Sequence, residues 1–228
     1  MRSILIVNPK GGSGKSTIAT NLASYYAVWG VQTALVDLDP QMSSLEWLRN
    51  RPKSSPDIQG MNGLKGYIYP ERGTQRIIYD APARSDTNKI VKLIKMTDAV
   101  IIPVLPSMID MRVVAKFVID LKNKYAKLNK VVQIGLVANR VNYNYRSFKA
   151  LEEFLSKLGI PVVASLRDSQ NYIKTAEQGV GIFEMPPSDV ASDLATWKQL
   201  VYWVEGKEFT EDDKVCLLYT SPSPRDRG

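Results

Sequence analysis

Residues 10–17, which read KGGSGKST, are an uninterrupted series of glycines, lysines and hydroxyl-bearing residues. The segment comes directly after a short β-branched run, residues 3–7, and directly before a helix-length stretch, which is the context of a phosphate-binding loop. Glycines permit backbone angles closed to other residues, so their N–H groups can converge on phosphate oxygens at the positive end of a helix. The predicted nucleotide-binding residues are Gly11, Gly12, Ser13, Gly14, Lys15, Ser16 and Thr17.

Two side chains of this loop suit a magnesium nucleotide. The ammonium group of Lys15 can reach the β- and γ-phosphates, and the hydroxyl of Ser16 can coordinate Mg²⁺. A glycine-rich turn with incidental lysines would rarely show all eight residues in this order at a strand–helix junction. We therefore expect ATP and Mg²⁺ as cofactors.

Apolar, strand-like runs alternate with helix-length segments along the chain. Continuous apolar strands are typical of a parallel sheet buried on both faces, and their alternation with helices is typical of a doubly wound α/β fold. The expected strands are residues 3–7, 33–36, 77–79, 99–105, 131–138 and 161–164, and the expected helices are residues 15–29, 43–50, 87–96, 107–127, 146–158, 169–178 and 188–205. Residues 51–74, rich in Gly and Pro, are expected to form loops or short excursions, with no strand of the sheet among them. We predict one domain of the P-loop NTPase type, a single, mostly parallel sheet flanked by helices.

Carboxylates follow two of the expected strands. Residues 36–41 read VDLDPQ and residues 77–82 read IIYDAP. The carboxyl ends of parallel strands border the crevice where ligands bind in such sheets, and phosphoryl transfer needs a positioned nucleophile and a metal. Taken alone, the paired aspartates would be better interpreted as a turn or a helix cap. Beside a phosphate loop, the nucleotide site is the better interpretation.

The loop resembles the deviant Walker A motif, K-G-G-x-G-K-[ST], of the ParA/MinD superfamily. It departs from the usual G-x-x-x-x-G-K-[ST] spacing because Pro9 stands where the first glycine would be. The resemblance implies that Lys10 reaches across an ATP-bridged homodimer to the partner's nucleotide. It also implies that Asp39 positions the attacking water, that Asp37 belongs to the magnesium shell, and that Asp80 holds Mg²⁺ through water as a Walker B aspartate.

Two further features bear on this resemblance, which covers about residues 1–205. Residues 102–111, IPVLPSMIDM, closely resemble a segment of ParA partition ATPases, whereas Tyr79 and Ala81 depart from the family pattern around the Walker B aspartate. Asn139 follows an expected strand, and its amide matches an asparagine that pairs with adenine in relatives; a turn or capping role is a close alternative. The resemblance implies a catalytic set of Lys10, Lys15 and Asp39 and slow ATP hydrolysis.

Composition narrows the classes of function. The chain has no histidine and one cysteine, which excludes histidine acid–base chemistry, a disulfide framework, and a Cys-ligated zinc or iron–sulfur site within one chain. No apolar run reaches membrane-spanning length and no signal peptide precedes the first strand, so we expect a cytoplasmic protein, and the resemblance to ParA proteins implies a bacterial one. Residues 216–228 resemble a translated sequencing adapter. We expect them to be a non-native, disordered tail and the ATPase domain to cover residues 1–215.

The formal net charge of +7 is compatible with nucleic-acid binding but is also common on solvated surfaces. Resemblance to ParA proteins implies non-specific binding to double-stranded DNA, association with the nucleoid, and a ParB-like or cargo-adaptor partner that stimulates hydrolysis. Such binding depends on neutralising phosphates and weakens steeply with salt. The candidate DNA-binding residues, around the expected helices 146–158 and 169–178, are Arg140, Arg146, Lys149, Arg167 and Lys174.

Other functions on the same scaffold remain open. A MinD-like ATPase of the membrane surface needs a basic amphipathic helix at its carboxyl end, and the acidic residues 205–214 argue against one. We therefore expect no membrane contact. Amide-ligating or biotin-pathway synthetases share the loop but fit the VDLDPQ and IPVLPSMIDM segments poorly. Arsenite- or tail-anchor-type ATPases normally carry extra helices or a doubled domain, and this chain is too short for either.

Overall fold

The computed structural model describes residues 1–66, 68–84, 87–125, 132–143 and 146–207. The strands are β1 (Arg2–Ile6), β2 (Thr33–Asp37), β3 (Gln59–Asn62), β4 (Arg76–Asp80), β5 (Ala99–Val104), β6 (Gln133–Val141) and β7 (Val162–Arg167). The α-helices are α1 (Lys15–Val28), α2 (Ser43–Arg49), α3 (Thr87–Lys95), α4 (Met108–Tyr125), α5 (Arg146–Ser156), α6 (Asn171–Gln178) and α7 (Pro187–Val204), joined by the short 3-10 helices η1 (Gly63–Lys65) and η2 (Ile182–Glu184). The tail predicted at residues 216–228 lies outside the described residues.

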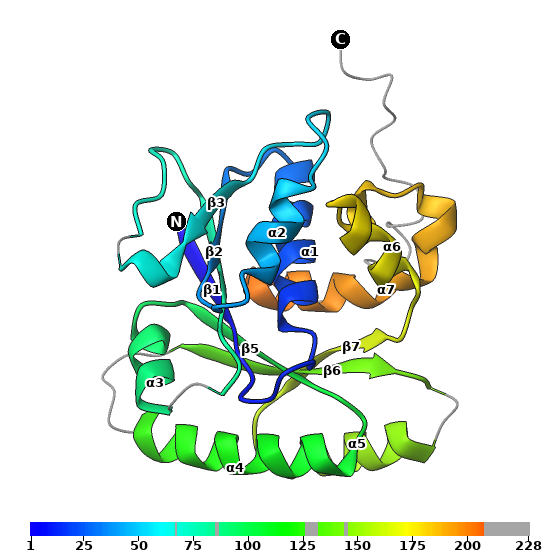
Figure 1. Cartoon of the computed structure of the whole chain (residues 1–228). Coiled ribbons are helices and arrows are strands. Elements are labelled where there is room, and N and C mark those ends of the chain that lie inside the picture. Colours follow the sequence, from blue (N-terminus) through cyan, green and yellow to red (C-terminus); the bar gives the residue numbers. More distant parts are fainter. Residues whose placement is uncertain (67, 85–86, 126–131, 144–145, 208–228) are drawn as a thin grey trace.

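All strand pairs described are parallel, in one seven-stranded sheet of order β3-β2-β4-β1-β5-β6-β7. The strand order reverses on either side of β1, because the chain first builds β2, β3 and β4 on one side and then β5, β6 and β7 on the other. This arrangement confirms the predicted doubly wound α/β fold (Figure 1). None of the described helices has both the length and the apolar content needed to cross a bilayer.

Helices cover both faces of the sheet and give it two apolar cores. In β1, Leu5 packs into the core under α3, α4 and α5, whereas its neighbours Ile4 and Ile6 pack into the core under α1, α2 and α7. Successive side chains of a strand point to opposite faces, so a continuous apolar run fills both cores. Figure 1 shows α4 and α5 below the sheet and α1, α2, α6 and α7 above it.

The prediction of loops throughout residues 51–74 is wrong at β3. This edge strand pairs in parallel with β2, and its sequence, QGMN, has no apolar alternation that would have signalled a strand. It packs under α2, where a Cβ placed on Gly60 would lie 2.5 Å from Leu48 Cδ2. The strand forms because β2 offers a free edge and Gly60 allows α2 to approach it closely.

The parallel arrangement brings the functional segments to one edge of the sheet. Asp37 and Asp80 are direct neighbours in the register of β2 and β4. Strands β6 and β7 extend beyond the predicted ends, so that Asn139 and Arg140 lie within β6, and Arg167 within β7 instead of near a helix. The carboxyl ends of β1, β2, β4 and β6 thus surround the loop that leads into α1.

Candidate nucleotide-binding site

The phosphate loop is anchored at its start by Asn8. This fully buried side chain donates a hydrogen bond from Nδ2 to the carbonyl of Pro103 at 2.6 Å and accepts one at Oδ1 from the backbone N–H of Lys10 at 2.7 Å. A buried amide must have partners, and here the partners are strand β5 and the loop itself. Sequence analysis missed Asn8, although a polar residue directly after an apolar strand was a signal for such an anchor.

A second asparagine fixes the loop where it enters α1. Gly14 has φ of 91°, and a Cβ there would lie 2.1 Å from Asn139 Nδ2, so the backbone conformation and the close approach both require glycine. Asn139, on β6, donates from Nδ2 to the carbonyl of Ser13 at 2.8 Å. The asparagine singled out for adenine therefore holds the loop in this structure, and its contact with adenine stays a prediction.

Lys15, the first residue of α1, places a buried cation inside the loop. Its Nζ donates to the carbonyl of Lys10 at 3.2 Å. Burial lowers the pKa of Lys15, and the negative charges of Asp80 and Asp39 offset that effect only in part. Above the loop, a Cβ on Gly12, where φ is 75°, would meet nothing within 4 Å. The donor set fits a polyphosphate, since a buried cation faces backbone that is open to an anion.

Asp80 and Ser16 have the chemistry for the predicted magnesium site. The Ser44 hydroxyl donates to Asp80 Oδ2, while Oδ1 is buried and accepts no hydrogen bond from any residue that the structure describes. Burial raises the pKa of Asp80 to about 6, with a further rise from Asp37, against the lowering effects of Ser44, Ser16 and Lys15. An unused buried carboxylate oxygen beside a serine hydroxyl suits a hard cation such as Mg²⁺.

Asp37 is engaged by backbone N–H groups. Its Oδ1 accepts from Asp39 N at 2.9 Å, and its Oδ2 accepts from Ser44 N at 2.9 Å and Leu45 N at 3.2 Å. The side chain is fully buried and holds the turn that leads into α2. This is the turn-and-cap arrangement that was the alternative for the paired aspartates, so a place for Asp37 in the magnesium shell stays a prediction.

Asp39 links the loop after β2 to the loop after β4. Its Oδ1 accepts from Gln41 N at 3.0 Å and its Oδ2 from Ala83 N at 3.1 Å. The next residue, Arg84, has φ of 58° and donates its N–H to the carbonyl of Pro9 at 2.8 Å. Backbone in a left-handed conformation is strained for residues other than glycine and tends to occur at functional sites. The carboxylate predicted to position water is thus linked, through the backbone of Ala83 and Arg84, to Pro9 at the start of the phosphate loop.

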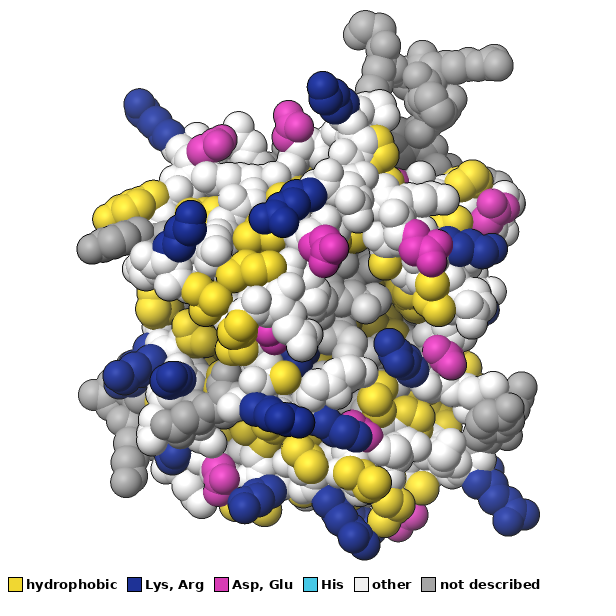
Figure 2. Space-filling view, in the orientation of Figure 1, with side chains coloured by type: hydrophobic (Ala, Val, Ile, Leu, Met, Phe, Trp, Pro, Cys, Tyr) yellow, Lys and Arg dark blue, Asp and Glu magenta, His cyan; other side chains and the backbone are white. Residues whose placement is uncertain are grey.

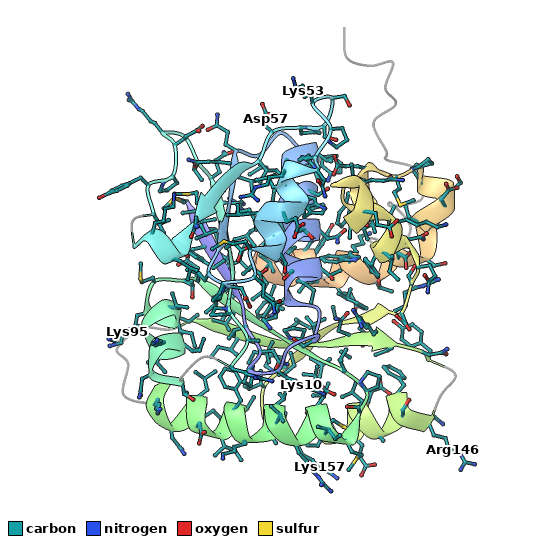
Figure 3. The ribbon with its side chains drawn as sticks, in the orientation of Figure 1. Lys10, Lys53, Asp57, Lys95, Arg146 and Lys157 are labelled. Carbon is teal, nitrogen blue, oxygen red and sulfur yellow. The ribbon has the colours of Figure 1, made fainter. Side chains whose placement is uncertain are left out.

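Lys10 points away from the loop interior. Its Nζ lies 2.7 Å from Asp110 Oδ2, in the first turn of α4. Figure 3 shows Lys10 between the phosphate loop and α4. The structure therefore brings the loop, Lys15, Ser16, Asp39 and Asp80 together at one edge of the sheet, and holds Lys10 within its own chain.

The five candidate DNA-binding residues are not as clearly gathered at one site as the nucleotide-binding residues are. Figure 2 shows Lys and Arg side chains spread over the visible face without a single gathering point. Arg167 is paired with the buried Asp193 at 3.0 Å, so its charge is already partly neutralised. Tyr143 packs edge-on against Phe148 and donates its hydroxyl hydrogen to the Ser165 carbonyl. The four candidates exposed to solvent are Arg140, Arg146, Lys149 and Lys174.

Comparisons with known proteins agree with this geometry. The family model "CobQ/CobB/MinD/ParA nucleotide binding domain" matches residues 4–182. A similar sequence is the "Maintenance of carboxysome distribution protein A" of Halothiobacillus neapolitanus, 27% identical over 191 residues that cover 80% of this chain and 87% of that protein. A similar solved structure is the MinD cell division protein of Aquifex aeolicus, with a TM-score of 0.70, 16% identity, and coverage of 92% of this chain and 99% of that chain. Another is an ATP complex of McdA from Cyanothece, with a TM-score of 0.67, 16% identity, and coverage of 92% of this chain and 98% of that chain. The chain therefore belongs to the ParA/MinD family of nucleotide-binding proteins.

Proposed function

We propose that this chain is a ParA-like ATPase that forms a dimer around Mg-ATP, binds DNA without sequence preference, and positions or segregates a plasmid, a chromosome region or a protein cargo. The observation that carries the proposal is the arrangement of the loop of residues 10–17. The Lys15 side chain is buried inside this loop, the Lys10 side chain points away from it, and the Asp80 oxygen without a hydrogen bond lies beside it. Relatives named for chromosome partition and for carboxysome distribution support the positioning role.

The residues of the site have separate tasks in the proposed hydrolysis. Lys15 and the loop N–H groups bind the phosphates, and Ser16 and Asp80 hold Mg²⁺, which when bound neutralises charge on the β- and γ-phosphate oxygens. Asp39 orients the attacking water. Its two carboxylate oxygens each accept one backbone hydrogen bond, from Gln41 N and Ala83 N, and each keeps the capacity to accept another from water. The bond to Ala83 N links Asp39 to the loop after β4, and this supports a hydrolysis step that responds to movements of that loop.

DNA and protein partners complete the proposal. The dimer would combine the exposed basic residues of both chains, which is the arrangement that non-specific phosphate contact needs. Hydrolysis would release the DNA, and a ParB-like or cargo-adaptor protein would stimulate that step. We expect the protein in the bacterial cytoplasm, associated with the nucleoid.

The test is equilibrium binding to random-sequence duplex DNA with Mg-ATP, with Mg-ADP and without nucleotide, across a series of salt concentrations. We expect binding only with ATP, weakening steeply as salt rises. Arg146→Ala, at the start of α5, should weaken binding and lower the salt slope by about 1 for each phosphate that the arginine neutralises. Lys53→Ala is the control, because Lys53 is an exposed cation at the opposite end of the molecule from Arg146 (Figure 3).

Failure of DNA binding would redirect the proposal. If the chain binds ATP but binds DNA in none of the nucleotide states, the alternative of a MinD-like ATPase acting at the membrane surface takes its place. Binding to vesicles of anionic phospholipid, with and without ATP, then tests that alternative.

A further inference from the structure

Lys10 is held within its own chain through both its backbone and its side chain. Asn8 fixes its backbone N–H, and its carbonyl accepts hydrogen bonds from Lys15 Nζ and from the Ser13 hydroxyl. Its own Nζ reaches Asp110 Oδ2, across a sequence separation of 100 residues. The Lys10 side chain is 36% exposed, so water reaches part of it while its ammonium group is bound to a carboxylate.

Asp110 is a buried carboxylate with few partners. Its side chain is 3% exposed, and the Ser107 hydroxyl donates to the same oxygen, Oδ2, that receives Lys10. The other oxygen, Oδ1, is buried and accepts no hydrogen bond within the described part of the chain. Burying a carboxylate is unfavourable unless a cation and hydrogen bonds compensate for the lost hydration. Here the compensating cation is Lys10.

Helix capping explains part of this arrangement but not the lysine. Ser107 precedes α4, and its Oγ accepts from Asp110 N at 3.2 Å while its carbonyl accepts from Met111 N at 3.0 Å. An acidic residue at the third helical position is a common part of such a cap. A cap needs no long-range cation, so the pairing with Lys10 is an additional feature of the site.

We propose that Asp110 is a positioning residue that retains Lys10 in its own subunit and thereby opposes the ATP-dependent dimer. The inference rests on the proposed function, in which Lys10 acts on the partner's nucleotide. In this proposal the Lys10 side chain extends to a phosphate in the other subunit and gives up its 2.7 Å contact with Asp110. Dimerisation must therefore break the pair in each subunit, leaving both Asp110 carboxylates without their cation, and ATP has to offset that loss.

The sign of the effect on dimerisation follows from this exchange. Asp110→Asn removes the charge that retains Lys10 and relieves the burial of an unpaired carboxylate in the dimer. Asp110 is buried but its partner Lys10 is half-exposed, so we assign the pair the modest strength of a partly solvated ion pair. Breaking one such pair in each subunit corresponds to a dimer dissociation constant about 10-fold lower in the variant. If Asp110 instead guided Lys10 towards the partner, the same substitution would weaken the dimer.

The experiment is sedimentation of the full chain over a range of protein concentrations with a non-hydrolysable ATP analogue and Mg²⁺. Wild type is compared with Asp110→Asn, Lys10→Ala and the double variant. Because the proposed effect acts through Lys10, Asp110→Asn should tighten the dimer in the wild-type background and change nothing in the Lys10→Ala background, a coupling that a purely structural role would not show. Asp110→Glu, which keeps the charge, should stay within about 2-fold of wild type.

Asp193→Asn is the matched control. Asp193 is 1% exposed and pairs with Arg167, which is 38% exposed, at 3.0 Å, so it repeats the burial and pairing of Asp110 on another part of the fold. It should leave dimerisation unchanged. If Asp110→Asn does not fold, Asp110→Ser, whose small uncharged hydroxyl can still bond to Ser107, replaces it.

The outcomes separate this inference from the proposed function. An equal or weaker dimer for Asp110→Asn, or a tighter dimer that persists without Lys10, overturns the role of Asp110 and leaves the ATPase proposal standing. A wild-type chain and an Asp110→Asn variant that both bind the analogue and both stay monomeric overturn the dimer proposal and the role of Asp110 together.

Discussion

Replacing Asp80 with asparagine should stabilise the nucleotide-free protein while removing magnesium binding. The carboxylate is 1% exposed, and burial raises its pKa from an ordinary 3.8 to about 6. Because the folded pKa lies above the unfolded one, ionised Asp80 disfavours the folded state at pH above 6, and this penalty disappears as the pH falls towards 4. The difference between the two pKa values corresponds to about 3 kcal/mol at neutral pH and above.

Asparagine has no charge to bury and can still accept the hydrogen bond from Ser44. We expect Asp80→Asn to raise the free energy of unfolding by about 1–3 kcal/mol at about pH 8, and the gain to vanish at about pH 4. The assay is urea denaturation with a chelator and without nucleotide. Mg²⁺-dependent ATP binding should be lost in the same variant.

Asp37→Asn is the control for this prediction, because Asp37 is equally buried and lies beside Asp80 in the sheet. Its carboxylate accepts three backbone hydrogen bonds, so we expect a loss of about 1–2 kcal/mol at the same pH. An Asp80→Asn variant that is no more stable than wild type at about pH 8, or whose gain does not shrink in acid, would refute the view that Asp80 is destabilised by its burial.

Three other substitutions test the remaining parts of the account. Lys15→Ala should abolish ATP binding, measured by calorimetry, because the loop loses its buried cation; retained affinity would remove Lys15 from the site. Asp39→Ala should bind ATP but turn it over far more slowly and accumulate as the dimer, measured by phosphate release and sedimentation; unchanged turnover would exclude its role with water. Glu184→Gln should lower the free energy of unfolding by about 3–5 kcal/mol in urea, because the buried Arg51, whose two Nη atoms each lie 2.9 Å from Glu184 oxygens, would lose its counter-charge. A loss under about 1 kcal/mol would show that water reaches Arg51.

The sequence predicted those parts of the site that are local in the chain. The phosphate loop can be recognised from the order of residues 10–17 alone, and the structure places Lys15 and Ser16 at the start of α1 as expected. The continuous apolar runs likewise predicted the parallel sheet, because a strand that is buried on both faces needs apolar residues at successive positions. These features need no knowledge of distant contacts.

The parts that sequence analysis missed depend on contacts between distant segments. Asn8 was not singled out because its partner, Pro103, belongs to another strand. Asn139 was matched to an adenine-binding asparagine of relatives, and its contact with Ser13, 126 residues away, was not foreseen. The IPVLPSMIDM segment had no evident chemistry until the fold placed Asp110 beside Lys10. Strand β3 was not predicted because it forms by pairing with the edge of β2, and its own residues have no strand-like pattern.

In the proposed function, ATP converts this chain from a monomer to a dimer. The most direct measurement is the molecular mass of the wild-type protein in solution, by light scattering, with Mg-ATP, with Mg-ADP and without nucleotide. We expect the mass of two chains with Mg-ATP and of one chain in the other two conditions. The mass of one chain in all three conditions, with ATP binding demonstrated in the same sample, would contradict the account.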